Sequence, residues 1–225
     1  DRSKDWQTQL TPFETFLTDD HARVPLAGVI ETMAASTAPI VYQALLRPKP
    51  DWTGEIENRR IDIELHQDTL GALLSTALVG YPEDEEVPLS DSDQQRLEEI
   101  TAKDARRSFE CRARVVIRSD DEATAHELRS VFAGVDHTCY AVGAAVRTGT
   151  AGAALFDALC EREFTTRTSR LPILGRPRPP LVVDGTEAAS FCVLDGDALT
   201  VAGKRALAPT PGEATAIAAP PADQL

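Results

Sequence analysis

The sequence predicts an α+β (or α/β) fold in which helices cover a mixed sheet. Residues 109–117 alternate apolar with mostly charged side chains, a pattern typical of a strand with one buried face. A helical repeat over 119–135, an uncharged run over 138–146 and a second helical repeat over 151–162 follow it. This strand–helix–strand–helix order indicates a ferredoxin-like or split strand–helix–strand arrangement covered by helices.

The first half of the chain predicts helices around one strand. Apolar residues recur at helical spacing after Pro25, which suits the first turn of a helix, and Pro39 ends that helix. Residues 40–48 are expected to form a well-buried strand, because they are almost uncharged and end at a proline. The remaining elements of this half are a helix over 56–78, an exposed acidic loop over 80–93 and a surface helix over 93–107.

Two helix starts carry the residues of a capping box. Ser119 and Glu122 have the required spacing before the central helix. Asp184 and Glu187 have the same spacing directly after a short apolar strand over 181–183. We therefore expect a helix to begin at each pair, and the second helix to be short.

The four cysteines predict reduced thiols, not a metal site or a disulfide framework. No CxxC pair and no histidine at ligand spacing is present, so a zinc site has no support. Cys111 falls on the apolar face of the 109–117 strand, and Cys160 joins Phe156 on the stripe that the 151–162 helix is expected to bury. Reduced thiols favour a cytoplasmic setting.

The charge of the chain constrains its partners and its source. A net charge of −13 argues against a general nucleic-acid-binding surface, because phosphate is repelled by such a field. Only four of the 23 basic residues are lysines, and the acid-rich, alanine-rich composition predicts a halophilic organism; an ordinary acidic bacterial protein is the alternative. No run approaches the length of a membrane span, so we expect membrane association only through partners.

Catalytic motifs are missing from the sequence. It contains no GxxxxGK[ST], GxGxxG, HExxH or GxSxG pattern. The histidines are isolated from one another along the chain: His21, His66, His126 and His137. We therefore expect no catalytic, cofactor-binding or metal-binding residues, and no enzyme active site wholly within this chain.

One basic run stands out in the acidic chain. Arg162, Arg167, Arg170, Arg176 and Arg178 occur together, with Glu163 as the only acid among them. They are a candidate interaction surface that could face an acidic partner or DNA phosphates. The alternative is that they are surface arginines that balance nearby acids.

Four stretches carry a resemblance to a known family. They are residues 25–48, which contain Tyr-Gln-Ala-Leu-Leu-Arg-Pro; Lys103 with the strand 109–117; residues 170–194; and residues 205–212. In this order they resemble the region that precedes the motor domain in archaeal, including haloarchaeal, HerA-like and FtsK-like ATPases, among them the conjugation (type IV secretion) ATPases. The family's nucleotide-binding motifs have no counterpart in this chain.

The resemblance implies a non-catalytic accessory domain that helps to assemble a DNA- or protein-translocating motor. Residues 1–205 would form this domain, with 1–80 and 105–205 as possible subdomains, and the Pro/Ala-rich stretch 206–225 would connect it to the motor. Protein partners and self-association through the parent ATPase are expected, and DNA contact only through the whole protein. The alternative is a free-standing acidic adaptor of a haloarchaeal plasmid or virus.

Overall fold

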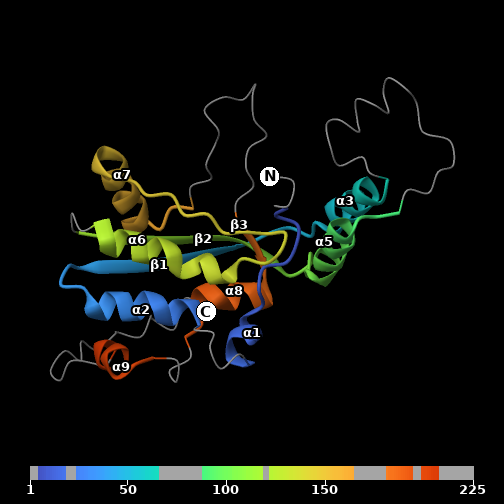
Figure 1. The fold of residues 1–225 in the computed structure, drawn as a ribbon. Helices are drawn as coiled ribbons and strands as arrows, with labels where there is room; N and C mark the ends of the chain where they lie inside the picture. Colours follow the sequence, from blue (N-terminus) through green and yellow to red (C-terminus); the bar gives the residue numbers. More distant parts are fainter. Residues whose placement is uncertain are drawn as a thin grey trace, which may run out of the picture.

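A three-stranded antiparallel sheet organises the protein, which has an α+β fold as predicted (Figure 1). The computed structural model describes residues 5–18, 24–65, 88–118, 122–164, 181–194 and 199–207. The strand order is β1 (Ile40–Pro48), β2 (Ser108–Ile117), β3 (Leu181–Asp184), so the two halves of the chain share one sheet. β1 pairs with β2 along its whole length, whereas β3 pairs only with Ser108–Cys111.

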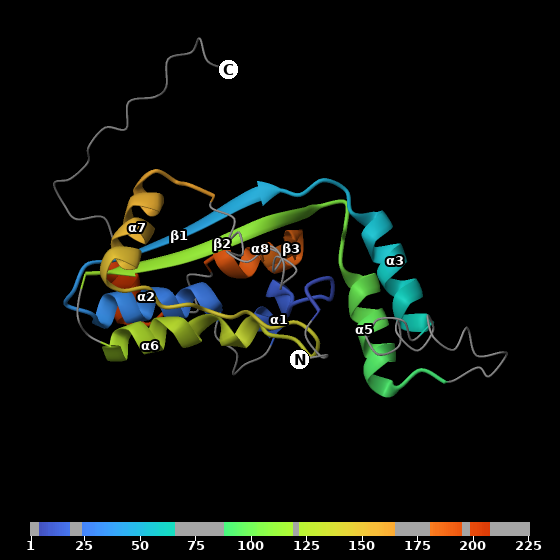
Figure 2. The same ribbon diagram turned by 90° about the horizontal axis from the view of Figure 1, so that it is seen from above.

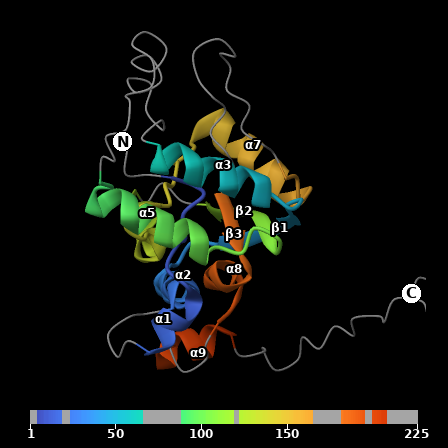
Figure 3. The ribbon, with the colours of Figure 1, turned by 90° about the vertical axis from the view of Figure 1, so that its right-hand side faces the viewer.

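Helices and the main apolar core lie on one face of the sheet. In Figure 1, α1, α2, α8 and α9 lie below the strands and α6 runs at their level, and Figure 3 shows α9 farthest below. The aromatic ring of Phe132 stacks on Tyr42 from β1 and on Phe191, with ring centroids 5.9 Å and 5.0 Å away. The elements are α1 (Phe13–Thr18), α2 (Pro25–Ala35), α6 (Glu122–Ser130), η1 (Val131–Val135), α8 (Gly185–Cys192) and α9 (Val201–Leu207). The prediction of a helix that starts at Pro25 is confirmed.

The outermost helix of this layer is attached through one glutamate. The carboxylate of Glu31 on α2 accepts hydrogen bonds from the backbone N–H and the hydroxyl of Thr200, both at 2.6 Å. Gly203 lies so close that an added Cβ would be 2.6 Å from the Glu31 carboxylate. These contacts place the start of α9 against α2. The helix ends at Leu207, past the predicted start of the connector at residue 206.

A second, smaller core lies beyond one end of the sheet. Figure 2 shows α3 (Thr53–Glu64) and α5 (Asp91–Ala102) side by side there, at the end opposite α7 (Gly149–Cys160). Ile56 and Ile63 on α3 and Ile100 on α5 are buried together with Trp52. The predicted helix over 56–78 is confirmed up to Glu64, and its residues 66–78 lie outside the described ranges. The predicted surface helix over 93–107 runs instead from Asp91 to Ala102, and its placement at the surface is wrong for one side, because Ile100 is fully buried in this core.

Lys103 links the two cores from a position of complete burial. Its ammonium group donates to the carbonyl oxygens of Thr8 (3.0 Å), Val182 (2.8 Å) and Trp6 (3.4 Å) and forms an ion pair with Glu187 at 3.2 Å. Burial lowers the pKa of Lys103, and the Glu187 carboxylate opposes that shift. One side chain thus ties the N-terminal segment, the end of α5, β3 and α8 together.

Glu187 is held by backbone groups as well as by Lys103. Its carboxylate accepts the N–H of Asp184 at 2.7 Å and the N–H of Leu10 at 2.5 Å, while Asp184 accepts the N–H of Glu187 at 3.0 Å. The predicted capping box at the start of α8 is therefore confirmed, with both reciprocal bonds. Glu187 caps a helix and fixes the N-terminal segment at the same time.

The predicted strand over 138–146 is wrong, because its backbone groups have other partners. The Cys139 carbonyl accepts from Asp5 N at 2.6 Å, the Tyr140 carbonyl from His137 N at 2.8 Å, and the Asp136 carboxylate accepts the Val142 N–H at 2.5 Å. These contacts hold the segment in irregular backbone between η1 and α7. An uncharged sequence alone could not distinguish this arrangement from a strand.

The burial expected for α7 is also partly wrong. Leu159 is buried, but Phe156 is 47% exposed and Cys160 is exposed. α7 lies on the face of the sheet opposite α2 and α8, where its last turn meets the polar side chains of Gln43 and Arg114. These side chains hold α7 through its backbone carbonyls, so the contact does not require a complete apolar stripe to be buried.

Several predictions fall on residues outside the described ranges. These are the capping serine Ser119, most of the acidic loop over 80–93, and the connector beyond Leu207. The division into subdomains 1–80 and 105–205 also stays a prediction.

Replacing Lys103 tests the link between the two cores. We expect Lys103→Met to lower the free energy of unfolding by about 3 kcal/mol or more, because the Glu187 carboxylate would remain buried without its cation. The control is Arg106→Met, since the Arg106–Asp51 pair is 3.9 Å apart with both side chains exposed, and its loss should destabilise the protein far less. Equal losses for both variants in urea denaturation would contradict this role of Lys103.

Candidate interaction surface

The outer edge of β1 is the most distinctive surface of the sheet. Two backbone hydrogen bonds fix its orientation: Lys49 N donates to Ser108 O at 2.9 Å, and Arg118 N donates to Pro39 O at 3.1 Å. In an antiparallel pair the hydrogen-bonded positions alternate, so the odd-numbered residues of β1 face β2. The N–H and C=O groups that point outward belong to Ile40, Tyr42, Ala44 and Leu46.

No described residue hydrogen-bonds to these outward-facing groups. Figure 2 shows β1 along the outer margin of the sheet. No residue of β1 is buried, and Val41 and Leu46 are 45% and 39% exposed. The prediction of a well-buried strand over 40–48 is therefore correct in its bounds and wrong in its burial, because uncharged residues here occupy an edge.

The opposite edge of the sheet is closed by side chains. Val182 of β3 donates its N–H to the Tyr140 hydroxyl at 3.3 Å, and its carbonyl accepts from Lys103 at 2.8 Å. The next outward N–H, that of Asp184, is bound by Glu187 at 2.7 Å. Proteins commonly protect sheet edges, because unpaired backbone groups there invite pairing with other chains. Among the described residues, β3 is therefore protected and β1 is left open.

The open edge has few charged side chains that would disfavour pairing with another chain. Every residue from Ile40 to Leu46 is uncharged, and the strand's one charged residue, Arg47, is paired with Glu110 on β2. The Arg47 guanidinium also lies 4.3 Å from the ring centroid of Phe164. Charged side chains on an edge strand usually disfavour pairing with another strand. Here the charge of Arg47 is balanced by Glu110 on the same face of the sheet.

α7 is anchored on the polar face of the sheet through its last turn. Gln43 donates to the Leu159 carbonyl at 3.0 Å and Arg114 to the Ala158 carbonyl at 2.8 Å, and Arg114 also donates to the Glu163 carbonyl. A cation at the carboxyl end of a helix is favourable, because the helix dipole places negative charge there. These bonds hold α7 above β1 and β2 without closing the strand's outer edge.

Of the five arginines predicted as an interaction surface, the structure describes only Arg162. It lies directly after α7 with φ at 54°, and its side chain is exposed. Its N–H donates to Leu159 O and that of Glu163 to Ala158 O, which is the bonding pattern of a Schellman motif. The other four arginines, Arg167, Arg170, Arg176 and Arg178, lie outside the described ranges, so the proposed cluster stays a prediction.

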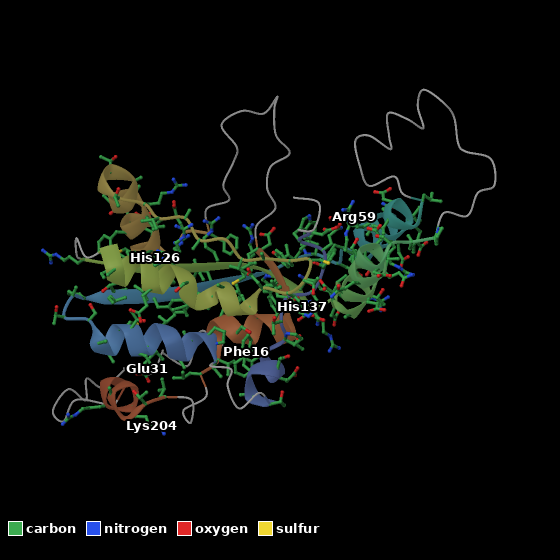
Figure 4. All side chains as sticks on the ribbon, in the orientation of Figure 1. Phe16, Glu31, Arg59, His126, His137 and Lys204 are labelled. Carbon is green, nitrogen blue, oxygen red and sulfur yellow. The ribbon has the colours of Figure 1, made fainter. Side chains whose placement is uncertain are left out.

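The described residues do not assemble a catalytic centre that we can recognise. Burial raises the pKa of Cys111 to about 12 and that of Cys139 to about 11, so both remain protonated thiols and weak nucleophiles at neutral pH. Figure 4 shows His126 on α6 well apart from His137, whose Nδ1 lies 2.7 Å from the carboxylate of Glu99. Within the described ranges, no three potential metal ligands come together.

Other polar contacts near the N-terminus serve the fold. The Asp5 carboxylate lies 2.7 Å from Arg59 on α3 and 3.3 Å from Arg96 on α5, which joins the two helices to the N-terminal segment. Among the described helices, none combines the length and apolar character needed to cross a membrane.

Comparison with models of known protein families, with curated proteins and with solved structures finds no match. The structure itself therefore carries the functional argument. Sequence reasoning missed the open edge of β1 and the roles of Lys103 and Tyr140 at the closed one. The only sequence signal for the edge was Pro48, because proline is confined largely to edge strands or strand ends.

Proline substitutions test which backbone groups of β1 face outward. Ala44→Pro removes an N–H that points away from β2 and should cost about 1 kcal/mol or less. Leu45→Pro removes an N–H of the β1–β2 ladder and should cost about 3 kcal/mol or more. Leu45→Ala, which keeps the backbone group, controls for the lost side chain. Thermal and urea unfolding of the three variants gives the comparison, and an equal loss at residues 44 and 45 would contradict the assigned orientation.

Proposed function

We propose that this chain is a non-catalytic assembly domain that binds protein partners by adding a strand to the open edge of β1. The observation that carries the proposal is the difference between the two edges of one sheet. Buried side chains cap β3, whereas the outward groups of β1 have no partner among the described residues. Strand addition supplies backbone hydrogen bonds to such an edge, with side chains adding specificity.

The parent protein proposed for this domain is a HerA-like or FtsK-like translocating ATPase of a halophilic archaeon, acting in the cytoplasm. The support is the resemblance of residues 25–48, of Lys103 with 109–117, and of 170–194 to the accessory region of that family. Sequencing the gene beyond Leu225 tests this proposal. We expect a GxxxxGK[ST] motif, which cradles nucleotide phosphates, within about a hundred codons. A stop codon directly after Leu225 would favour the free-standing adaptor instead, and ATP hydrolysis by the isolated chain would contradict both.

Site-specific photo-crosslinking in the native cells tests the edge as a binding surface. A photoreactive amino acid replaces Leu46, which is 39% exposed on β1, or Val193, which is 44% exposed beside α8. We expect a discrete adduct at position 46 and little at position 193, because only the first lies on the open edge. Mass spectrometry of the adduct then identifies the bound segment.

Two results would count against strand addition at β1. One is equal crosslinking at positions 46 and 193, which indicates nonspecific apolar contact. The other is an adduct at position 46 that persists unchanged in the Ala44→Pro variant, whose edge lacks a central N–H. An adduct with the motor protein, with an adaptor or with a second copy of the chain would each support an assembly role.

A further inference from the structure

The open edge of β1 is self-complementary, and we propose that its occupant is β1 of a second copy of this chain, paired antiparallel across a two-fold axis. This proposal rests on the proposed use of the β1 edge for binding and adds the identity of the partner. The product would be a continuous six-stranded sheet that runs from one closed β3 edge to the other. Its two ends would carry the Lys103 and Tyr140 caps, so no open edge would remain on β1 or β3.

The strand's composition favours this pairing. From Ile40 to Leu46 no side chain is charged, so antiparallel copies bring no like charges face to face in that stretch. Arg47 lies near one end of the strand, so antiparallel pairing separates the two copies of Arg47, whereas a parallel, in-register pair would place them together. Each Arg47 also keeps its own partner, Glu110.

The exposed apolar groups of the strand would be covered by the same contact. Val41 and Leu46 point to opposite faces of the sheet, and both are largely exposed in the single chain. When Ala44 pairs with Leu46 of the other copy, Leu46 lies beside the uncharged Ala44, and Val41 lies opposite the alkyl chain of Lys49. A two-fold interface uses one patch on both copies, so this match satisfies both sides at once.

The neighbouring elements limit where the axis can pass. The last turn of α7 lies over Gln43, because Gln43 donates to Leu159 O. An axis at Gln43 would therefore bring two copies of that helix end together. An axis nearer Leu45 separates them and still pairs Ala44 with Leu46 of the other copy, since both have outward-facing backbone groups.

Sedimentation equilibrium of the purified chain tests the proposal. We expect a concentration-dependent rise from 24.3 kDa to twice that mass, and tighter association as salt is raised, because the net charge of −13 on each copy is then screened. Ala44→Pro and Leu46→Lys should each weaken the dimer at least about tenfold, which corresponds to about 1.4 kcal/mol. Val193→Lys replaces a similarly exposed apolar residue that is not part of β1 and should leave the dimer unchanged.

The outcomes separate this proposal from the broader assembly role. A chain that stays monomeric at several hundred micromolar in high salt overturns the pairing of two copies, while a crosslink from position 46 to another protein would still support assembly through β1. A dimer that Val193→Lys weakens as much as Leu46→Lys, or that folded Ala44→Pro leaves intact, also overturns it. Circular dichroism confirms that each variant is folded before its mass is compared.

Discussion

The buried ion pair between Lys103 and Glu187 is the contact on which most of the structure depends. Two ionisable groups in a fully buried site are costly unless each has several partners, and here the backbone supplies them. The Lys103 ammonium group donates to carbonyl oxygens of the N-terminal segment and β3. The Glu187 carboxylate accepts from N–H groups of the N-terminal segment and the start of α8. Three parts of the chain that are distant in sequence, namely the N-terminal segment, the end of α5 and the consecutive elements β3 and α8, therefore meet at one pair.

This pair also contributes to the difference between the two edges of the sheet. By binding the outward carbonyl of Val182, Lys103 closes the β3 edge, and Tyr140 completes the closure from the irregular segment after η1. The cation lies 4.8 Å from the Tyr140 ring centroid, so the two caps also stabilise each other. With β3 closed in this way, the proposed pairing with another chain would fall on β1. The fold would then link a structural centre to the choice of binding edge.

Local patterns predicted part of this architecture. The bounds of β1, the alternation of β2 and the capping box of Asp184 and Glu187 follow from spacing along the chain, and the structure confirms them. The burial of β1 could not be predicted, because an uncharged strand looks alike whether it is central or at an edge.

The predicted strand over 138–146 was wrong for a related reason, since the backbone partners of this segment, such as Asp5, lie far away in sequence. The exposure of Phe156 could not be predicted, because α7 is held through backbone carbonyls by Gln43 and Arg114, which lie far away in sequence. Of the candidate site, only Arg162 could be compared with the structure at all.

Amide hydrogen exchange along β1 tests the central claim, an open edge on an otherwise protected sheet, most directly. In solution dilute enough to keep the chain monomeric, the account predicts an alternating pattern. The outward amides of Tyr42, Ala44 and Leu46 should exchange fast, and those of Val41, Gln43 and Leu45 slowly. On the other edge, the amide of Val182 should be protected by Tyr140. Uniform protection of all β1 amides in the dilute monomer would contradict the account, because it would mean that another part of the chain already covers this edge.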